Sequence, residues 1–162
     1  MGNLKFGATA CAAILAIAAT PCAAEPLCWN AKAIEAAKLR QLDVMLMVGS
    51  LRCRNGPSDY RAAYDGFLSQ HRAMLGHANF EILSEMRSVL GAAGAADALD
   101  KASVRMANRY GESSALGCSD LGLVTDALAR SSGDALPRAA QLLVGKEVVL
   151  ASCAVQMAAA GR

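Results

Sequence analysis

The chain has 162 residues, which is enough for one domain, and 54% of them are hydrophobic but only 4% aromatic. Its formal net charge is +2, and no basic stripe stands out in the sequence. This balance does not indicate nucleic acid or an anionic membrane surface as a partner. A core must therefore come from aliphatic residues, methionine and alanine on closely packed helices.

Residues 1–24 have the pattern of a secretory signal peptide. Lys5 lies beside the amino terminus, an apolar run follows from 6 to 19, and small residues at 22–24 form the cleavage site. The apolar run is shorter than the ~20 residues that a membrane-spanning helix needs. The sequence thus predicts a periplasmic or secreted protein, with no membrane attachment after cleavage and a single helical domain over 25–162.

Residues 30–54 are predicted to form one continuous helix, because Asn30 is a suitable N-cap and no proline interrupts the segment. The stretch 44–51 is apolar on every side, which is typical of a helix that others surround. Gly49 is expected to allow a neighbouring element to approach closely. A turn follows at 54–59.

Four cysteines remain after cleavage: Cys28, Cys53, Cys118 and Cys153. Their even number in an exported chain predicts two disulfides, and no two of them form a C-x-x-C motif. Across a continuous helix Cys28 and Cys53 would lie about 37 Å apart. A disulfide requires Cα atoms about 4.4–6.8 Å apart, so the 28–53 pairing is excluded.

Two disulfide connectivities then remain. One joins Cys28 to Cys118 and Cys53 to Cys153, and the other joins Cys28 to Cys153 and Cys53 to Cys118. An up-down alternation of five helices would place Cys53 and Cys153 at the same end of the bundle. This consideration favours the first connectivity.

The rest of the chain shows helical spacing and no strand signal. Residues 59–90 are expected to form one long helix with an apolar stripe, or alternatively two consecutive helices, and 91–97 a loop. Further helices are predicted over 98–110 with Asp97 as cap, over 119–129, and over 135–157 with Asp134 as cap. The predicted architecture is an all-α bundle of about five helices stapled by two disulfides.

His71 and Met74 are the candidates for a soft-metal site, since imidazole and thioether groups suit copper. They share a helix face, whereas the directions of His71 and His77 differ by about 240° on a helix of 3.6 residues per turn. The favoured interpretation places His71 on an apolar face with a hydrogen-bond partner, His77 in solvent, and the methionines in packing. The sequence therefore predicts no metal site and no cofactor.

The sequence shows no catalytic constellation. It contains neither G-x-S-x-G nor Ser-x-x-Lys, and Asp59, Asp65, Glu81 and Glu85 have the spacing of a solvated surface. The leading hypothesis is a binding or interaction module, not an enzyme, whose partner is a protein or a small molecule. The alternatives are a copper-binding or stress protein that uses His71 and Met74, and an enzyme of unrecognised type.

Three segments carry a resemblance: CWNAKAIEAAKLRQLDVMLMVGSLRC, DYRAAYDGFLSQHRAML and MANRYG. Together with Cys118 they resemble a group of small exported bacterial proteins with four cysteines. The resemblance implies export, helices and paired cysteines, and it assigns no catalytic residue. Some members are named adenosylhomocysteine hydrolase, but this chain lacks the strands and the glycine fingerprint of a dinucleotide-binding fold.

Overall fold

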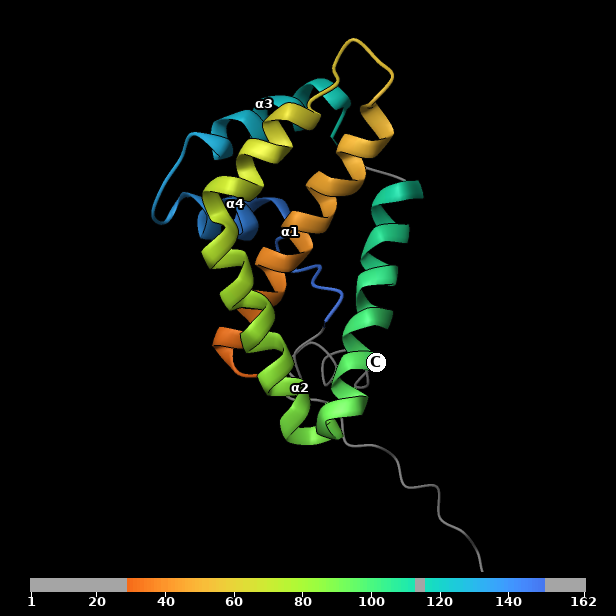
Figure 1. Ribbon diagram of the computed structural model, residues 1–162, viewed down its shortest axis with the longest axis vertical. Coiled ribbons are helices and arrows are strands. Elements are labelled where there is room, and N and C mark those ends of the chain that lie inside the picture. Colours follow the sequence, from red (N-terminus) through yellow and green to blue (C-terminus); the bar gives the residue numbers. More distant parts are fainter. Residues whose placement is uncertain (1–28, 113–115, 151–162) are drawn as a thin grey trace, which may run out of the picture.

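The computed structural model describes residues 29–112 and 116–150, which form four helices and no strand (Figure 1). They are α1 (Ala31–Cys53), α2 (Arg61–Glu112), α3 (Cys118–Ala129) and α4 (Ala135–Leu143). The all-α class is confirmed, and the expected number of about five helices is corrected to four within these ranges. The predicted signal peptide, Cys28 and Cys153 lie outside them.

The first helix, α1, forms the centre of the bundle, as predicted. Asn30 caps it, because its Oδ1 accepts a hydrogen bond of 3.0 Å from the Ala33 backbone N–H. All six residues from 41 to 46 are buried, and α1 contacts each of the other three helices. A helix surrounded in this way can offer only its two ends and narrow strips of its sides to a ligand.

The predicted loop at 91–97 is wrong, because α2 continues through this segment. Only Gly91 departs from helical geometry, with φ 69° and ψ 175°, a conformation that favours glycine. The alanines around it are strong helix formers, so the chain reverses at one residue and resumes its helix at once. Asp97 lies inside this helix, where Lys101 Nζ donates to it at 2.8 Å, and is not a cap.

Gly91 divides α2 into a first arm, 61–90, and a second arm, 92–112. Figure 1 shows the two arms on either side of α1. The predicted apolar stripe of the first arm is largely buried, with Phe67, Leu75 and Ile82 among its core residues. Val89, at the end of the stripe, is 60% exposed.

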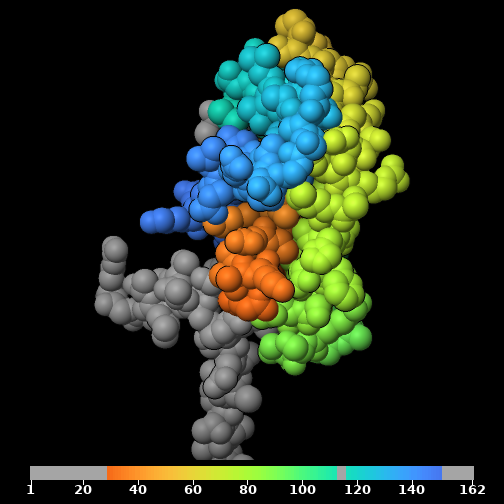
Figure 2. Space-filling view, turned by 90° about the vertical axis from the view of Figure 1, so that its left-hand side faces the viewer, coloured from red at the N-terminus to blue at the C-terminus, as the bar shows by residue number. Residues whose placement is uncertain are grey.

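The last two helices are short and cover one side of the bundle, as Figure 2 shows for the segments coloured teal and blue. α3 matches its prediction, whereas α4 ends at Leu143 and does not reach residue 157. The reason is Gly145, whose φ of 59° lies in the left-handed region that ends helices. Asp134 makes no capping hydrogen bond and instead lies 3.7 Å from Arg138.

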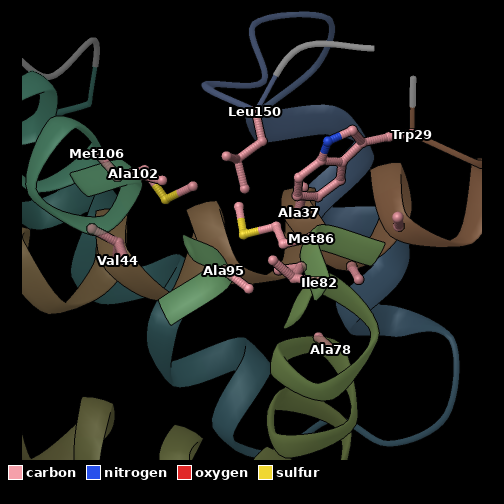
Figure 3. Packing of buried hydrophobic residues seen from close by; sticks show 12 residues of the cluster. Trp29, Ala37, Val44, Ala78, Ile82, Met86, Ala95, Ala102, Met106 and Leu150 are labelled. Atoms are coloured by element: carbon pink, nitrogen blue, oxygen red, sulfur yellow. The ribbon is translucent and has the colours of Figure 1, made fainter. Parts of the chain in front are cut away.

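Two buried clusters lie along α1. One of them gathers alanines and methionines from α1 and both arms of α2, and it includes Trp29 and Leu150 (Figure 3). The other surrounds Leu42 and Leu46 with residues of the first arm, α3 and α4. The small alanine side chains allow the helix backbones to approach closely, which explains how the core can be filled with so few aromatic residues.

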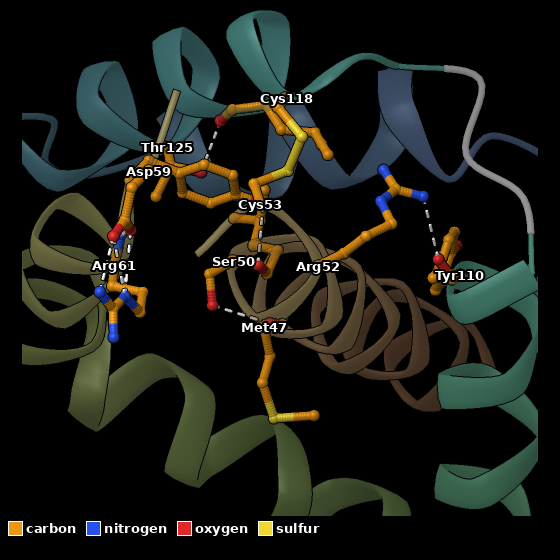
Figure 4. Close-up of a disulfide and its surroundings, with 12 residues drawn as sticks. Met47, Ser50, Arg52, Cys53, Asp59, Arg61, Tyr110, Cys118 and Thr125 are labelled. Atoms are coloured by element: carbon orange, nitrogen blue, oxygen red, sulfur yellow. Dashed lines mark hydrogen bonds and ion pairs between the residues drawn. A yellow bond between two sulfur atoms is a disulfide. The ribbon is translucent and has the colours of Figure 1, made fainter. Parts of the chain in front are cut away.

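A disulfide joins Cys53 at the end of α1 to Cys118 at the start of α3, with Cα atoms 5.7 Å apart (Figure 4). The favoured pairing of Cys53 with Cys153 is therefore wrong, and with it the pairing of Cys28 with Cys118. The second arm returns to the end of α1 and delivers Cys118 there. The described segment that leads towards Cys153 runs elsewhere, because Leu150 packs in the cluster of Trp29.

Candidate functional site

A groove of about 620 Å³ lies between the second half of α1 and the start of α2. Its lining residues are Met47, Ser50 and Leu51 of α1, and Asp59, Arg61, Ala62, Tyr64 and Asp65 at the start of α2. The groove thus combines apolar walls with charged and hydroxyl groups. Its volume is within the range of sites for small molecules, about 300–1,000 Å³.

The rim of the groove carries one ion pair and one unpaired carboxylate. Arg61 donates from Nη2 to Asp59 Oδ2 at 2.6 Å and from Nε to both Asp59 oxygens at 3.1 Å (Figure 4). These bonds hold the pKa of Asp59 below its usual value. Asp65, in contrast, makes no hydrogen bond or close ion pair with the part of the chain that the structure describes, although its negative charge helps to raise the pKa of Arg61.

A chain of polar side chains begins at the groove and crosses α1. The Tyr64 hydroxyl donates to Asp43 Oδ1 at 2.9 Å, and the other oxygen of Asp43 lies 3.5 Å from Arg40 Nη1. Arg40 Nη2 then donates to Ser103 Oγ at 3.4 Å. The polar chain therefore ties the first arm of α2, through α1, to the second arm.

Burial changes the pKa values of two of these polar side chains, Asp43 and Tyr64. It raises the pKa of Asp43, although the Tyr64 hydrogen bond and the charge of Arg40 act in the opposite direction. Burial also raises the pKa of Tyr64, and the negative charge of Asp43 adds to this effect. Tyr64 therefore stays protonated at neutral pH and continues to donate its hydrogen to Asp43.

Tyr60, which directly precedes α2, packs against α1. The Tyr60 hydroxyl donates to the Leu46 carbonyl at 3.1 Å, and burial raises the pKa of Tyr60 to about 12. Tyr60 reaches this position because Gly49 has no side chain; a Cβ there would overlap the Tyr60 hydroxyl and come within 2.8 Å of Leu121 Cδ1. The close approach expected at Gly49 is confirmed.

The structure places His71 as the favoured interpretation predicted. Its ring is buried, and Nε2 donates to the Leu128 carbonyl at 2.9 Å. His77 is exposed and lies 3.4 Å from Glu81 Oε1. Met74 lines a smaller groove of about 240 Å³ together with His77, not with His71. Within the described residues, no group of three or more His, Cys, Asp and Glu side chains could hold a metal ion.

Asp43, Ser50 and Tyr64 were not predicted as site residues, and Asp59 and Asp65 were predicted to lie on a solvated surface. Asp43 did carry a signal, since it is a charged residue between Leu42 and the apolar stretch 44–51 of a central helix. A carboxylate in that position requires a partner, because burying an unpaired charge is costly. The groove itself depends on the packing of two helices and leaves no pattern in the sequence.

Comparisons with known proteins add no assignment. A scan against protein-family models, a search of curated proteins and a search of solved structures each found no match. None of the helices in the described part of the chain has the length and apolar character needed to cross a membrane.

Proposed function

We propose that this chain is an exported, disulfide-stabilised helical module that binds a ligand or a protein partner in the groove between α1 and α2. The observation that carries the proposal is the groove itself, about 620 Å³ with apolar, hydroxyl and charged side chains. Export to the periplasm or beyond is supported by the signal-peptide pattern and by the Cys53–Cys118 bond, since disulfides persist in oxidising compartments.

A disulfide and two buried or half-buried hydrogen bonds connect the elements around this groove. Cys53 fixes the end of α1 to α3, and the buried Tyr60 fixes the start of α2 to α1. The Tyr64–Asp43 hydrogen bond adds a third connection. A site that is already ordered loses little conformational entropy when it binds, so such a framework favours affinity.

The geometry of the hydroxyl groups favours binding over catalysis. Ser50 Oγ donates to the Met47 carbonyl at 2.8 Å, and the Tyr64 hydroxyl donates to a carboxylate that is itself buried. The Met47 carbonyl is not a base that could take a proton from Ser50, and the groove residues include no histidine. We therefore propose binding as the role of the groove.

Filling the groove tests the proposal. Ala62 is an exposed groove residue, and Ala62→Trp should block the site; Ala73→Trp is the matched control on an exposed position of the same helix outside the groove. The two variants and the wild type would be recovered from the periplasm and examined by native mass spectrometry and pull-down. We expect Ala62→Trp alone to lose the co-purifying ligand or protein. Equal retention by both variants would contradict the proposal.

A further inference from the structure

Both hydroxyl groups of the groove residues donate their hydrogen to another group of the protein. Ser50 Oγ donates its hydrogen to the Met47 carbonyl, and Tyr64 donates its hydrogen to Asp43 Oδ1. A hydroxyl carries one hydrogen and two lone pairs, so each of these oxygens can act towards a further partner only as an acceptor. Hydroxyl groups usually can pair with either a donor or an acceptor, but those of Ser50 and Tyr64 can pair only with a donor.

The charged groups of the groove also favour a ligand that donates hydrogen bonds. Arg61 points Nε and Nη2 at Asp59, so the positive charge at the rim is already matched by a carboxylate. The groove holds two carboxylates and one guanidinium, so Asp65 adds a negative charge that Arg61 attracts but does not hydrogen-bond, and an ionised carboxylate is also an acceptor. Met47 and the half-exposed Leu51 provide apolar surface beside these acceptors.

We infer that the groove selects a small organic cation, namely an ammonium or guanidinium group carried on an apolar stem. The N–H donors of the cation bind the oxygens of Ser50, Tyr64 and Asp65. The stem lies against Met47 and Leu51, whose apolar surface it removes from water. This inference rests on the proposed function, because it names the ligand class of the same groove.

The test compares three probes that share one apolar stem: hexylammonium, hexanol and hexanoate. Each is titrated into the purified full domain and followed by two-dimensional NMR. We expect hexylammonium to bind more tightly than the other two, and its affinity to fall as salt is raised. Asp65→Asn should weaken hexylammonium binding about threefold, as expected for an exposed charge pair, and should affect hexanol, which carries no charge, less. The control Asp100→Asn alters an exposed carboxylate of the second arm, away from the groove, and should change neither.

Three other outcomes would contradict the inference. If hexanol or hexanoate binds as tightly as hexylammonium and Ala62→Trp abolishes binding, the groove is a binding site but the cation preference is wrong. If hexylammonium binds equally to wild type and to Ala62→Trp, the cation lies elsewhere and the inference fails. If no probe binds, the inference also fails, while the pull-down with Ala62→Trp still decides the proposed function.

Discussion

Gly49→Ala tests the closest contact between α1 and the segment that opens α2. The added Cβ would overlap the Tyr60 hydroxyl and approach Leu121 Cδ1 to 2.8 Å, so one of these side chains has to move. Tyr60 is only 5% exposed, and its hydroxyl donates to the Leu46 carbonyl. Moving the ring would therefore break a hydrogen bond in a place that water does not reach.

Three contributions determine the size of the effect. Overpacking costs ~1–3 kcal/mol, and leaving a buried donor or acceptor unsatisfied costs ~1–3 kcal/mol. Alanine gains ~1 kcal/mol over glycine in helix propensity. The net expectation is a loss of about 3 kcal/mol of unfolding free energy, which for a domain of this size lowers Tm by about 10 °C.

Urea denaturation of Gly49→Ala and Gly76→Ala measures this effect against a matched control. Gly76 is also helical, but no atom lies within 4 Å of its would-be Cβ, so the same substitution there should stabilise by up to ~1 kcal/mol. In a Tyr60→Phe background the overlap with the hydroxyl disappears, and the cost of Gly49→Ala should fall by ~1–2 kcal/mol. If Gly49→Ala is as stable as the wild type, the packing argument is wrong.

Three other predictions concern stability. Cys53→Ser should lose about 4 kcal/mol by the chain-entropy estimate for a loop of this length, whereas His77→Ala, an exposed residue, should change calorimetric Tm little; equal effects would contradict the role of the disulfide. Gly91→Ala should lose ~1–3 kcal/mol in urea titration, because its φ of 69° and ψ of 175° suit only glycine, and a neutral result would argue against the sharp reversal. Because burial raises the folded-state pKa of Asp43, the stabilising contribution of this carboxyl is present below its unfolded pKa and is lost as pH rises through the folded pKa. Asparagine does not titrate, so the unfolding free energy of Asp43→Asn relative to wild type should increase with pH from about pH 4 upwards, as measured by denaturation at several pH values. A difference that does not change with pH would contradict the raised pKa of Asp43.

The long first helix and its central place could be predicted because they follow from local information. Asn30 has the side chain of an N-cap, and the stretch 44–51 has no polar face to turn towards water. That His71 would have a hydrogen-bond partner was also foreseeable, since a buried imidazole needs one. Nothing in the local sequence identified the Leu128 carbonyl as that partner.

The reversal at Gly91 was not foreseeable in the same way. Two glycines within 91–97 are typical of a loop, yet the alanines between and after them favour helix, and only one glycine takes the left-handed conformation. Once the second arm returns along α1, Cys118 arrives beside Cys53, and the expected alternation no longer decides the pairing. The acceptor character of Ser50 and Tyr64 likewise depends on which carbonyl or carboxylate lies within reach, and that is a property of the packed helices.

The bond between Cys53 and Cys118, which are separated by 65 positions in the sequence, closes the backbone between them into a covalent ring. A protease that cuts the first arm or the second arm once would therefore release nothing, because both products stay attached through sulfur. Such a nicked molecule would keep its full mass on a non-reducing gel and separate into two bands only after a reductant is added. Damage to the longest helix would thus leave the α1 wall of the groove joined to α3.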